Sequence, residues 1–100
     1  MNDIQNEIFW GAMEESGVWE VVSSIAAAKR VNREVAFDLL KSELDFIKSN
    51  EKIHLLYSEK LYESETSREL DKDALTKLQL DDVEFHENGP FYYVSSSKKI

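Results

Sequence analysis

Apolar residues recur at helical spacing from the start of the chain. Ile4, Ile8 and Ala12 stand four positions apart, which places them on one face of a helix. We therefore predict a first helix over residues 2–16. Gly17 follows this segment and is expected to end the helix, because glycine readily adopts the left-handed conformation found at helix C-termini.

Two further helices follow from the same kind of pattern. Residues 18–30 are apolar over much of a helical circumference, which indicates a central, buried helix. Phe37, Leu40 and Leu44 then repeat on one face of a third helix, which we expect over residues 32–49. The first half of the chain is thus predicted to be helical.

The pattern changes from a helical to an alternating period after the third helix. Residues 52–57 alternate between apolar and polar side chains, as in a strand with one buried face. Residues 58–68 are polar and acidic, so we predict a loop there. A short helix is expected over residues 69–80, where leucines and an alanine repeat on one stripe.

Strand and turn signals occupy the C-terminal part of the chain. Residues 83–85 alternate and residues 91–94 form an apolar run, with the turn-favouring dipeptide Asn88-Gly89 between them, which predicts a β-hairpin. For residues 1–100 we therefore predict a single α+β domain. Three N-terminal helices pack on a small, mostly antiparallel sheet, one further short helix is present, and the element order resembles that of a winged helix.

Composition narrows the classes of protein to which the chain can belong. Hydrophobic residues make up 42% of it, with three glycines and one proline, so a core is expected without metals or disulfides. The absence of cysteine excludes a disulfide framework, a thiolate zinc site and a cysteine nucleophile. Acids stand where a signal peptide needs bases, and no apolar run approaches the roughly 20 residues of a membrane span. We predict a cytoplasmic protein without membrane contact or cofactor.

Charge gives the main indication of function. Twenty acids against twelve bases leave a net charge of −8, which repels nucleic acid and attracts cationic surfaces. Residues 59–87 hold ten acids and four bases, a net charge of −6. Such a segment is either a solvated surface or a docking face whose carboxylates and aromatic rings bind a basic protein. The residues predicted to contact that partner are Tyr62, Glu63, Glu65, Asp81, Asp82, Glu84 and Tyr92.

The favoured hypothesis is a non-enzymatic, acidic protein-binding module, an immunity-type inhibitor that neutralises a basic toxin or nuclease. Nucleases are basic because they hold nucleic acid, so an acidic surface can mimic the phosphates of their substrate. Association with such a partner is expected to be fast and sensitive to salt.

A winged-helix-like transcriptional regulator is the alternative. Lys29, Arg30 and Arg33 cluster between the second and third predicted helices, where a helix-turn-helix protein contacts DNA phosphates. The helix that would enter the groove also carries acids, among them Glu34 and Asp38, which repel phosphate. Binding of nucleic acid is therefore the second hypothesis and not the first.

One cluster could carry metal or acid–base chemistry. If residues 83–85 are a strand, Asp82, Glu84 and His86 share one face and present two carboxylates and an imidazole. The same pattern is typical of the solvent face of a half-buried strand. No motif of a known catalytic or phosphate-binding loop accompanies it, so we predict neither a catalytic nor a metal-binding residue.

One stretch carries a family resemblance. The sequence AFDLLKSELDFIKSNEKIHLLY, preceded by Trp10 and Trp19 in helical context, resembles the small bacterial proteins of domain-of-unknown-function family 596. It is also similar to short acidic immunity-type proteins encoded near contact-dependent toxin systems. The shared pattern is a helix followed by a basic and apolar strand. The resemblance implies a non-enzymatic bacterial immunity protein and transfers no catalytic residues.

Overall fold

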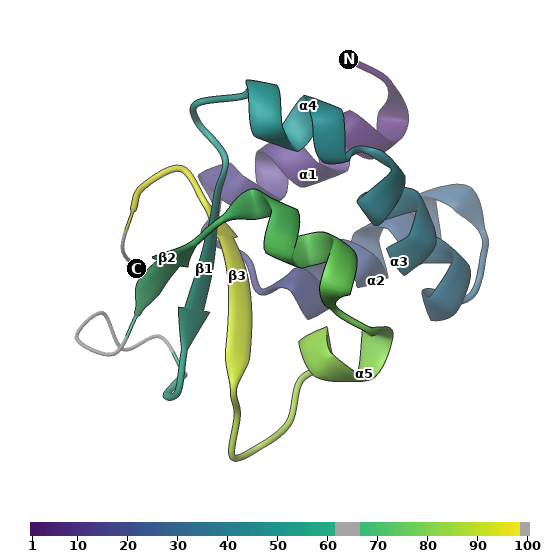
Figure 1. Ribbon diagram of the computed structural model, residues 1–100. Coiled ribbons are helices and arrows are strands. Elements are labelled where there is room, and N and C mark those ends of the chain that lie inside the picture. The colour runs from purple at the N-terminus through teal and green to yellow at the C-terminus, as the bar shows by residue number, and fades with distance from the viewer. Residues whose placement is uncertain (62–66, 99–100) are drawn as a thin grey trace.

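Helices lie on one side of the molecule and a small sheet lies on the other (Figure 1). The structure is a computed structural model, and it describes residues 1–61 and 67–98. The predicted α+β class and the order of helices before sheet are confirmed. The elements of the described residues are α1 (Asp3–Met13), α2 (Val18–Lys29), α3 (Arg33–Ser42), α4 (Leu44–Ser49), β1 (His54–Ser58), β2 (Arg68–Leu70), the 3-10 helix η2 (Lys72–Lys77), α5 (Leu80–Val83) and β3 (Phe91–Ser95).

The first two helices agree with the apolar pattern, but Gly17 has a different role from the predicted one. The helix α1 ends at Met13, and Glu15 takes the positive φ of 54° in the turn. Gly17 is the N-cap of α2, with a φ of −61°. A Cβ at this position would lie 2.4 Å from the ring of Trp19, so the position requires glycine for lack of space.

The single helix predicted over residues 32–49 is two helices, α3 and α4, separated at Glu43. The break coincides with a contact between distant parts of the chain. The Glu43 carboxylate accepts hydrogen bonds from Asn2 Nδ2 at 3.2 Å and from Gln5 Nε2 at 2.9 Å. This link to the start of α1 depends on tertiary structure, so the local apolar pattern does not contain it.

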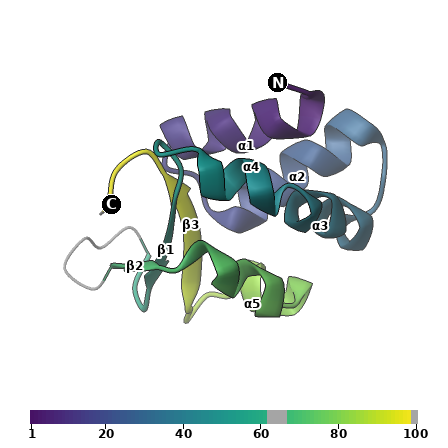
Figure 2. The same ribbon diagram turned by 45° about the horizontal axis from the view of Figure 1, so that its top comes forward.

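The three strands form an antiparallel sheet in the order β2-β1-β3. Leu55 of the central strand is paired with Leu70 on one side and with Val94 on the other. The outer edge of β3 is held by the turn between α1 and α2, since the Val94 N–H donates to the Ser16 carbonyl at 2.9 Å. Figure 2 shows the helices α1 to α4 beside this sheet and α5 below them.

The predicted hairpin and the predicted helix over residues 69–80 are both wrong. The strand β3 pairs with β1, and residues 83–85 lie at the end of α5 and in the extended chain after it. Residues 69–80 are divided among β2, η2 and the start of α5. Leu75 of η2 and Val83 of α5 are buried in the core, and Ala74 and Leu80 are partly buried against it, so each short helix is anchored by two apolar side chains.

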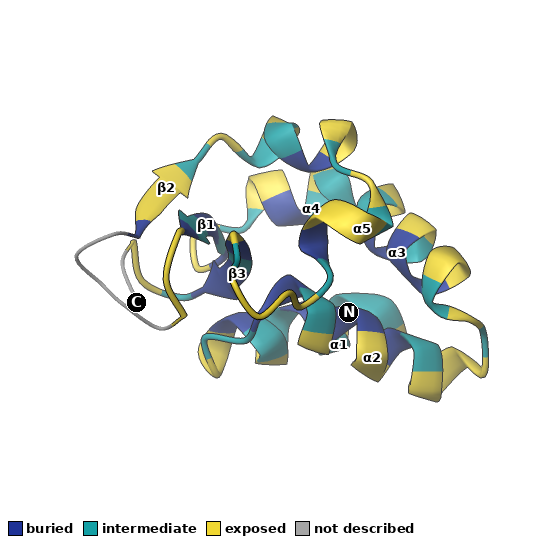
Figure 3. Cartoon of the chain, turned by 90° about the horizontal axis from the view of Figure 1, so that it is seen from below, coloured by how far each residue is buried: buried dark blue, intermediate teal, exposed yellow. Residues whose placement is uncertain are grey.

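Two apolar clusters lie on opposite faces of the sheet. Leu55 belongs to the main core, which the helices share, whereas its neighbour Leu56 packs with Phe91, Tyr93 and Trp19 on the other face. Figure 3 shows β1 and β3 largely buried and β2 and α5 largely exposed. Among residues 1–61 and 67–98, no helix is long and apolar enough to cross a membrane.

Candidate functional site

The structure describes four of the seven residues predicted to contact a partner. Asp81 and Asp82 are exposed on α5, whereas Glu84 and Tyr92 are half-buried. The contacts of these four within the protein decide how far each can face a partner. Those that lie outside the described residues are Tyr62, Glu63 and Glu65.

Glu84 forms an internal ion pair with Arg33, the first residue of α3. Arg33 Nε donates to Glu84 Oε2 at 2.8 Å, and Nη2 donates to Oε1 at 2.5 Å. The guanidinium also donates to Ser23 Oγ at 2.6 Å and to the Trp19 carbonyl at 3.0 Å, both on α2. The hydrogen bond with Glu84 raises the pKa of Arg33, against the opposing effect of burial. Glu84 therefore links α5 to α3 and α2.

Asp81 and Asp82 differ in their contacts although they are neighbours on α5. Asp82 Oδ2 accepts from the Gln79 N–H at 2.7 Å and so caps the helix, while the Asp81 side chain is 93% exposed. The His86 ring nitrogen Nε2 lies 2.7 Å from the Asp81 carbonyl oxygen. Because this stretch is a short helix followed by extended chain, the strand face predicted for Asp82, Glu84 and His86 does not form. No group of three potential metal ligands converges within residues 1–61 and 67–98.

Tyr92 lies on β3 beside an aromatic and a basic neighbour. Its ring meets that of Tyr57 edge to face at 5.4 Å, and the Arg68 guanidinium stands over the Tyr57 ring at 4.7 Å. Burial raises the pKa of Tyr92, with smaller contributions from Tyr57 and from the negative charge of Asp82. Tyr92 thus contributes to the packing of the sheet and keeps part of its surface exposed.

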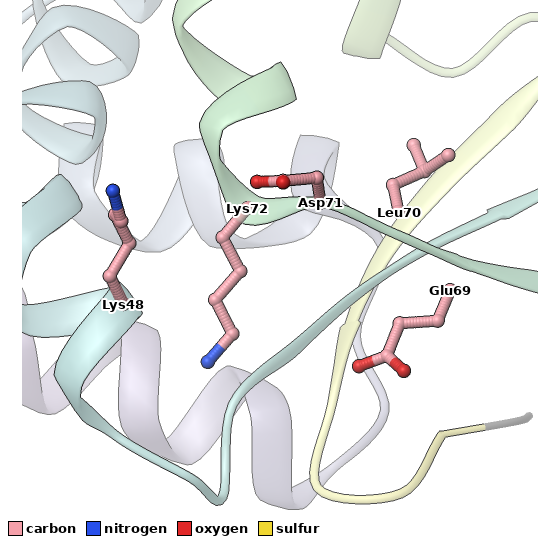
Figure 4. A pocket seen from close by; sticks show the side chains of 5 residues that line it. All are labelled: Lys48, Glu69, Leu70, Asp71 and Lys72. Atoms are coloured by element: carbon pink, nitrogen blue, oxygen red, sulfur yellow. The ribbon is translucent and has the colours of Figure 1, made fainter.

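A hollow of about 400 Å³ lies where β2, η2 and α4 meet, and Figure 4 shows the side chains that line it. Its charged groups are used for internal links. Lys72 Nζ donates to the carbonyls of Ile47 and Asn50 at 2.9 and 3.0 Å, which satisfies the end of α4. Lys48 pairs with Asp73 at 3.0 Å. These contacts join α4 to η2, so the charged side chains at the hollow have a structural role.

The acids that line the same hollow are also engaged. Glu69 Oε2 lies 2.6 Å from Nδ1 of His54 on the neighbouring strand. Asp71 Oδ1 accepts from the Asp73 N–H at 2.8 Å and caps η2. The internal partners of Glu69 and Asp71 account for the positions of both carboxylates, so neither points to a ligand.

A second cleft, of about 160 Å³, lies between α1 and α2. Trp10, which is 59% exposed, stands at this cleft with its ring edge to face against that of Phe9 at 5.8 Å. No base lines it. The residues that line the cleft are Glu7, Trp10, Gly11, Glu14, Ser16, Glu20, Val21 and Ser24.

The charges of the N-terminal segment indicate this cleft, although the apolar pattern that predicts the helices does not. Residues 1–28 include five acids and no lysine, arginine or histidine. Glu7 and Trp10 of α1 and its C-cap Glu14 stand on one side at helical spacing, opposite the buried Ile8 and Ala12. An exposed tryptophan on an acidic stripe could therefore be found from the spacing, but the second wall of the cleft depends on how α2 packs.

Several bases of the described residues form ion pairs or hydrogen bonds with other groups of the chain. Lys29, one of the predicted DNA contacts, pairs with Asp3 at 3.2 Å, and Arg33 is held by Glu84. Lys41 donates to the Leu78 carbonyl at 3.2 Å. Arg30 is the exposed, left-handed C-cap of α2.

Comparison of the chain with known protein families, with curated proteins and with solved structures gives no match.

Proposed function

We propose that the protein binds a basic protein and acts as an immunity-type inhibitor of a basic toxin or nuclease. The supporting observation is the unequal use of charge. Several cations are held by carboxylates or backbone carbonyls, whereas Glu14, Asp45 and Asp81 are exposed to solvent. The bases held in this way are Lys29, Arg33, Lys41, Lys48 and Lys72.

Because these bases are paired and the acids are exposed, the electrostatic potential at the surface is negative. With a net charge of −8, the field attracts a basic surface over a distance of about one Debye length, roughly 10 Å at moderate salt. A nuclease must be basic to hold nucleic acid, so carboxylates can occupy the positions of its substrate phosphates. A bacterial, cytoplasmic setting belongs to the same proposal, since a chain without cysteine has no disulfide to gain in an oxidising compartment.

A winged-helix-like regulator is the weaker candidate. Duplex binding through Lys29 and Arg33 would compete with their ion pairs to Asp3 and Glu84. Arg30 remains exposed, but Glu34 and Asp38 on the following helix are exposed as well and repel phosphate. Duplex binding at low salt that falls in an Arg30→Ala variant would favour the regulator over the inhibitor.

Capture from lysate of the native host, followed by purification of what is retained, tests the proposal. We expect a basic protein to bind at low salt and to be released at high salt, because the attraction is electrostatic. Its purified form should lose activity when mixed with this protein, and co-expression should protect cells from it. Retention of acidic or neutral proteins alone, or binding that does not respond to salt, would contradict the proposal.

A further inference from the structure

The cleft between α1 and α2 combines an aromatic ring with carboxylates at one place. We propose that it docks a basic segment of the partner protein, with an arginine or lysine side chain stacked on the indole of Trp10. This inference rests on the proposed function, since it assumes a basic partner, and it adds the site and the chemistry of the contact.

Trp10 has the exposure expected of a binding residue. Its side chain is 59% exposed, although tryptophan is a large apolar residue that folding would ordinarily bury. The partly buried Phe9 supports the indole by an edge-to-face contact at an interplanar angle of 82°. Phe9 therefore contacts one side of the indole, and the rest of the ring is exposed to solvent. Tryptophan gives the strongest cation–π interaction among the aromatic side chains.

Carboxylates from both sides of the cleft line it together with this ring. Glu7 comes from α1, Glu14 is the C-cap of that helix, and Glu20 comes from the first turn of α2. The Glu20 carboxylate accepts from the Gly17 N–H at 2.9 Å, which fixes its position. A cationic side chain stacked on Trp10 would thus meet acids on two sides.

Size and charge together select the occupant. A volume of about 160 Å³ is smaller than the roughly 300–1,000 Å³ of pockets that enclose a drug-sized ligand, and it suits the end of one side chain. A second copy of this chain would bring a net charge of −8 to an acidic cleft, and nucleic acid would bring phosphates. A basic protein segment is the occupant that the charge favours.

Titration of the ¹⁵N-labelled protein at low salt tests the inference. The probe is a blocked peptide of alternating arginine and alanine, and its control has glutamine in place of arginine. The chain has two tryptophans, so a Trp10→Phe variant assigns their indole N–H signals. We expect the arginine peptide to shift the Trp10 indole signal and the amides of Glu14 and Glu20, and the glutamine peptide to leave them unchanged.

Matched variants separate the contribution of the Trp10 ring to peptide binding from the contribution of the overall negative charge. Trp10→Ala should weaken peptide binding about fivefold, the equivalent of one exposed cation–π contact. Met13→Ala, which removes another exposed apolar side chain of the same helix, should change it less than about twofold. Replacing Glu7 and Glu14 by glutamine should lower both the affinity and its salt dependence. Thermal unfolding of each variant confirms that the fold is kept.

Two other results would overturn the inference. Shifts centred on Asp81 and Tyr92, with affinity unchanged in Trp10→Ala, would move the docking site to α5 and β3 and leave the proposed function standing. Absence of binding by the arginine peptide at low salt would count against both the cleft and the proposed preference for basic partners.

Discussion

The Arg33–Glu84 ion pair connects residues 51 positions apart in the chain. Arg33 and Glu84 side chains are 38% and 27% exposed, so water weakens their attraction. We expect a coupling free energy of about 1 kcal/mol in a double-mutant cycle of Arg33→Ala and Glu84→Gln, measured by urea unfolding. Additive effects of the two changes would show that the ion pair adds nothing to stability.

Tyr92 gives the stability of the fold a dependence on alkaline pH. Burial, with Tyr57 and Asp82 adding to it, raises the pKa of Tyr92 above its ordinary value of about 10. The folded state therefore holds the phenol proton more tightly than the unfolded chain does. The resulting stabilisation is fully present below about pH 10 and is lost as the pH rises through the folded pKa.

A Tyr92→Phe variant checks this pH dependence. The urea midpoint of the wild type should fall more steeply between about pH 9 and pH 11 than that of the variant, which has no phenol to ionise at this position. Parallel curves for the two proteins would mean that Tyr92 titrates alike in the folded and unfolded states.

At the scale of elements, the close approach of α1 to α2 depends on Gly11. A Cβ there would lie 2.6 Å from Val21 Cγ2, in a buried contact. Gly11→Ala should gain about 1 kcal/mol of helix propensity but lose roughly 1–3 kcal/mol to this overlap, a net destabilisation. In a Val21→Ala background the overlap disappears, so the same change should stabilise the protein. Chemical denaturation of the four proteins in the cycle measures the change of sign, and the same sign in both backgrounds would contradict the contact.

The sequence predicted those elements whose signal is local. Apolar spacing over three or more turns was enough for α1 and α2, and alternation was enough for β1. The prediction from apolar periodicity was wrong between residues 69 and 85, because elements of three to six residues carry too few apolar positions to define a period. The predicted hairpin was wrong for another reason. The partner of β3 is β1, more than 30 residues earlier, and the Asn88-Gly89 turn instead connects α5 to β3.

At the scale of the whole molecule, the sequence gives the net charge and its distribution along the chain, but it does not show which charges lie exposed on the folded surface. The acidic segment over residues 59–87 predicts a single docking face, yet Glu84 is paired with Arg33 and Asp82 caps its own helix. Residues 1–28 carry five acids and no base, a net charge of −5, which is close to the −6 of residues 59–87. Which carboxylates remain available depends on pairings between distant residues, and those pairings exist only after folding.

The position of β3 has a consequence for how the protein is made. Its outer edge bonds to the carbonyl of Ser16, and the following Ser96 N–H donates to the Ala12 carbonyl at 2.9 Å. The helices α1 and α2 leave the ribosome before β3, because the strand that closes the sheet against them is synthesised some 80 residues after Ser16. We therefore expect a nascent chain that holds its helices without a closed core and reaches cooperative stability only after translation has passed residue 95.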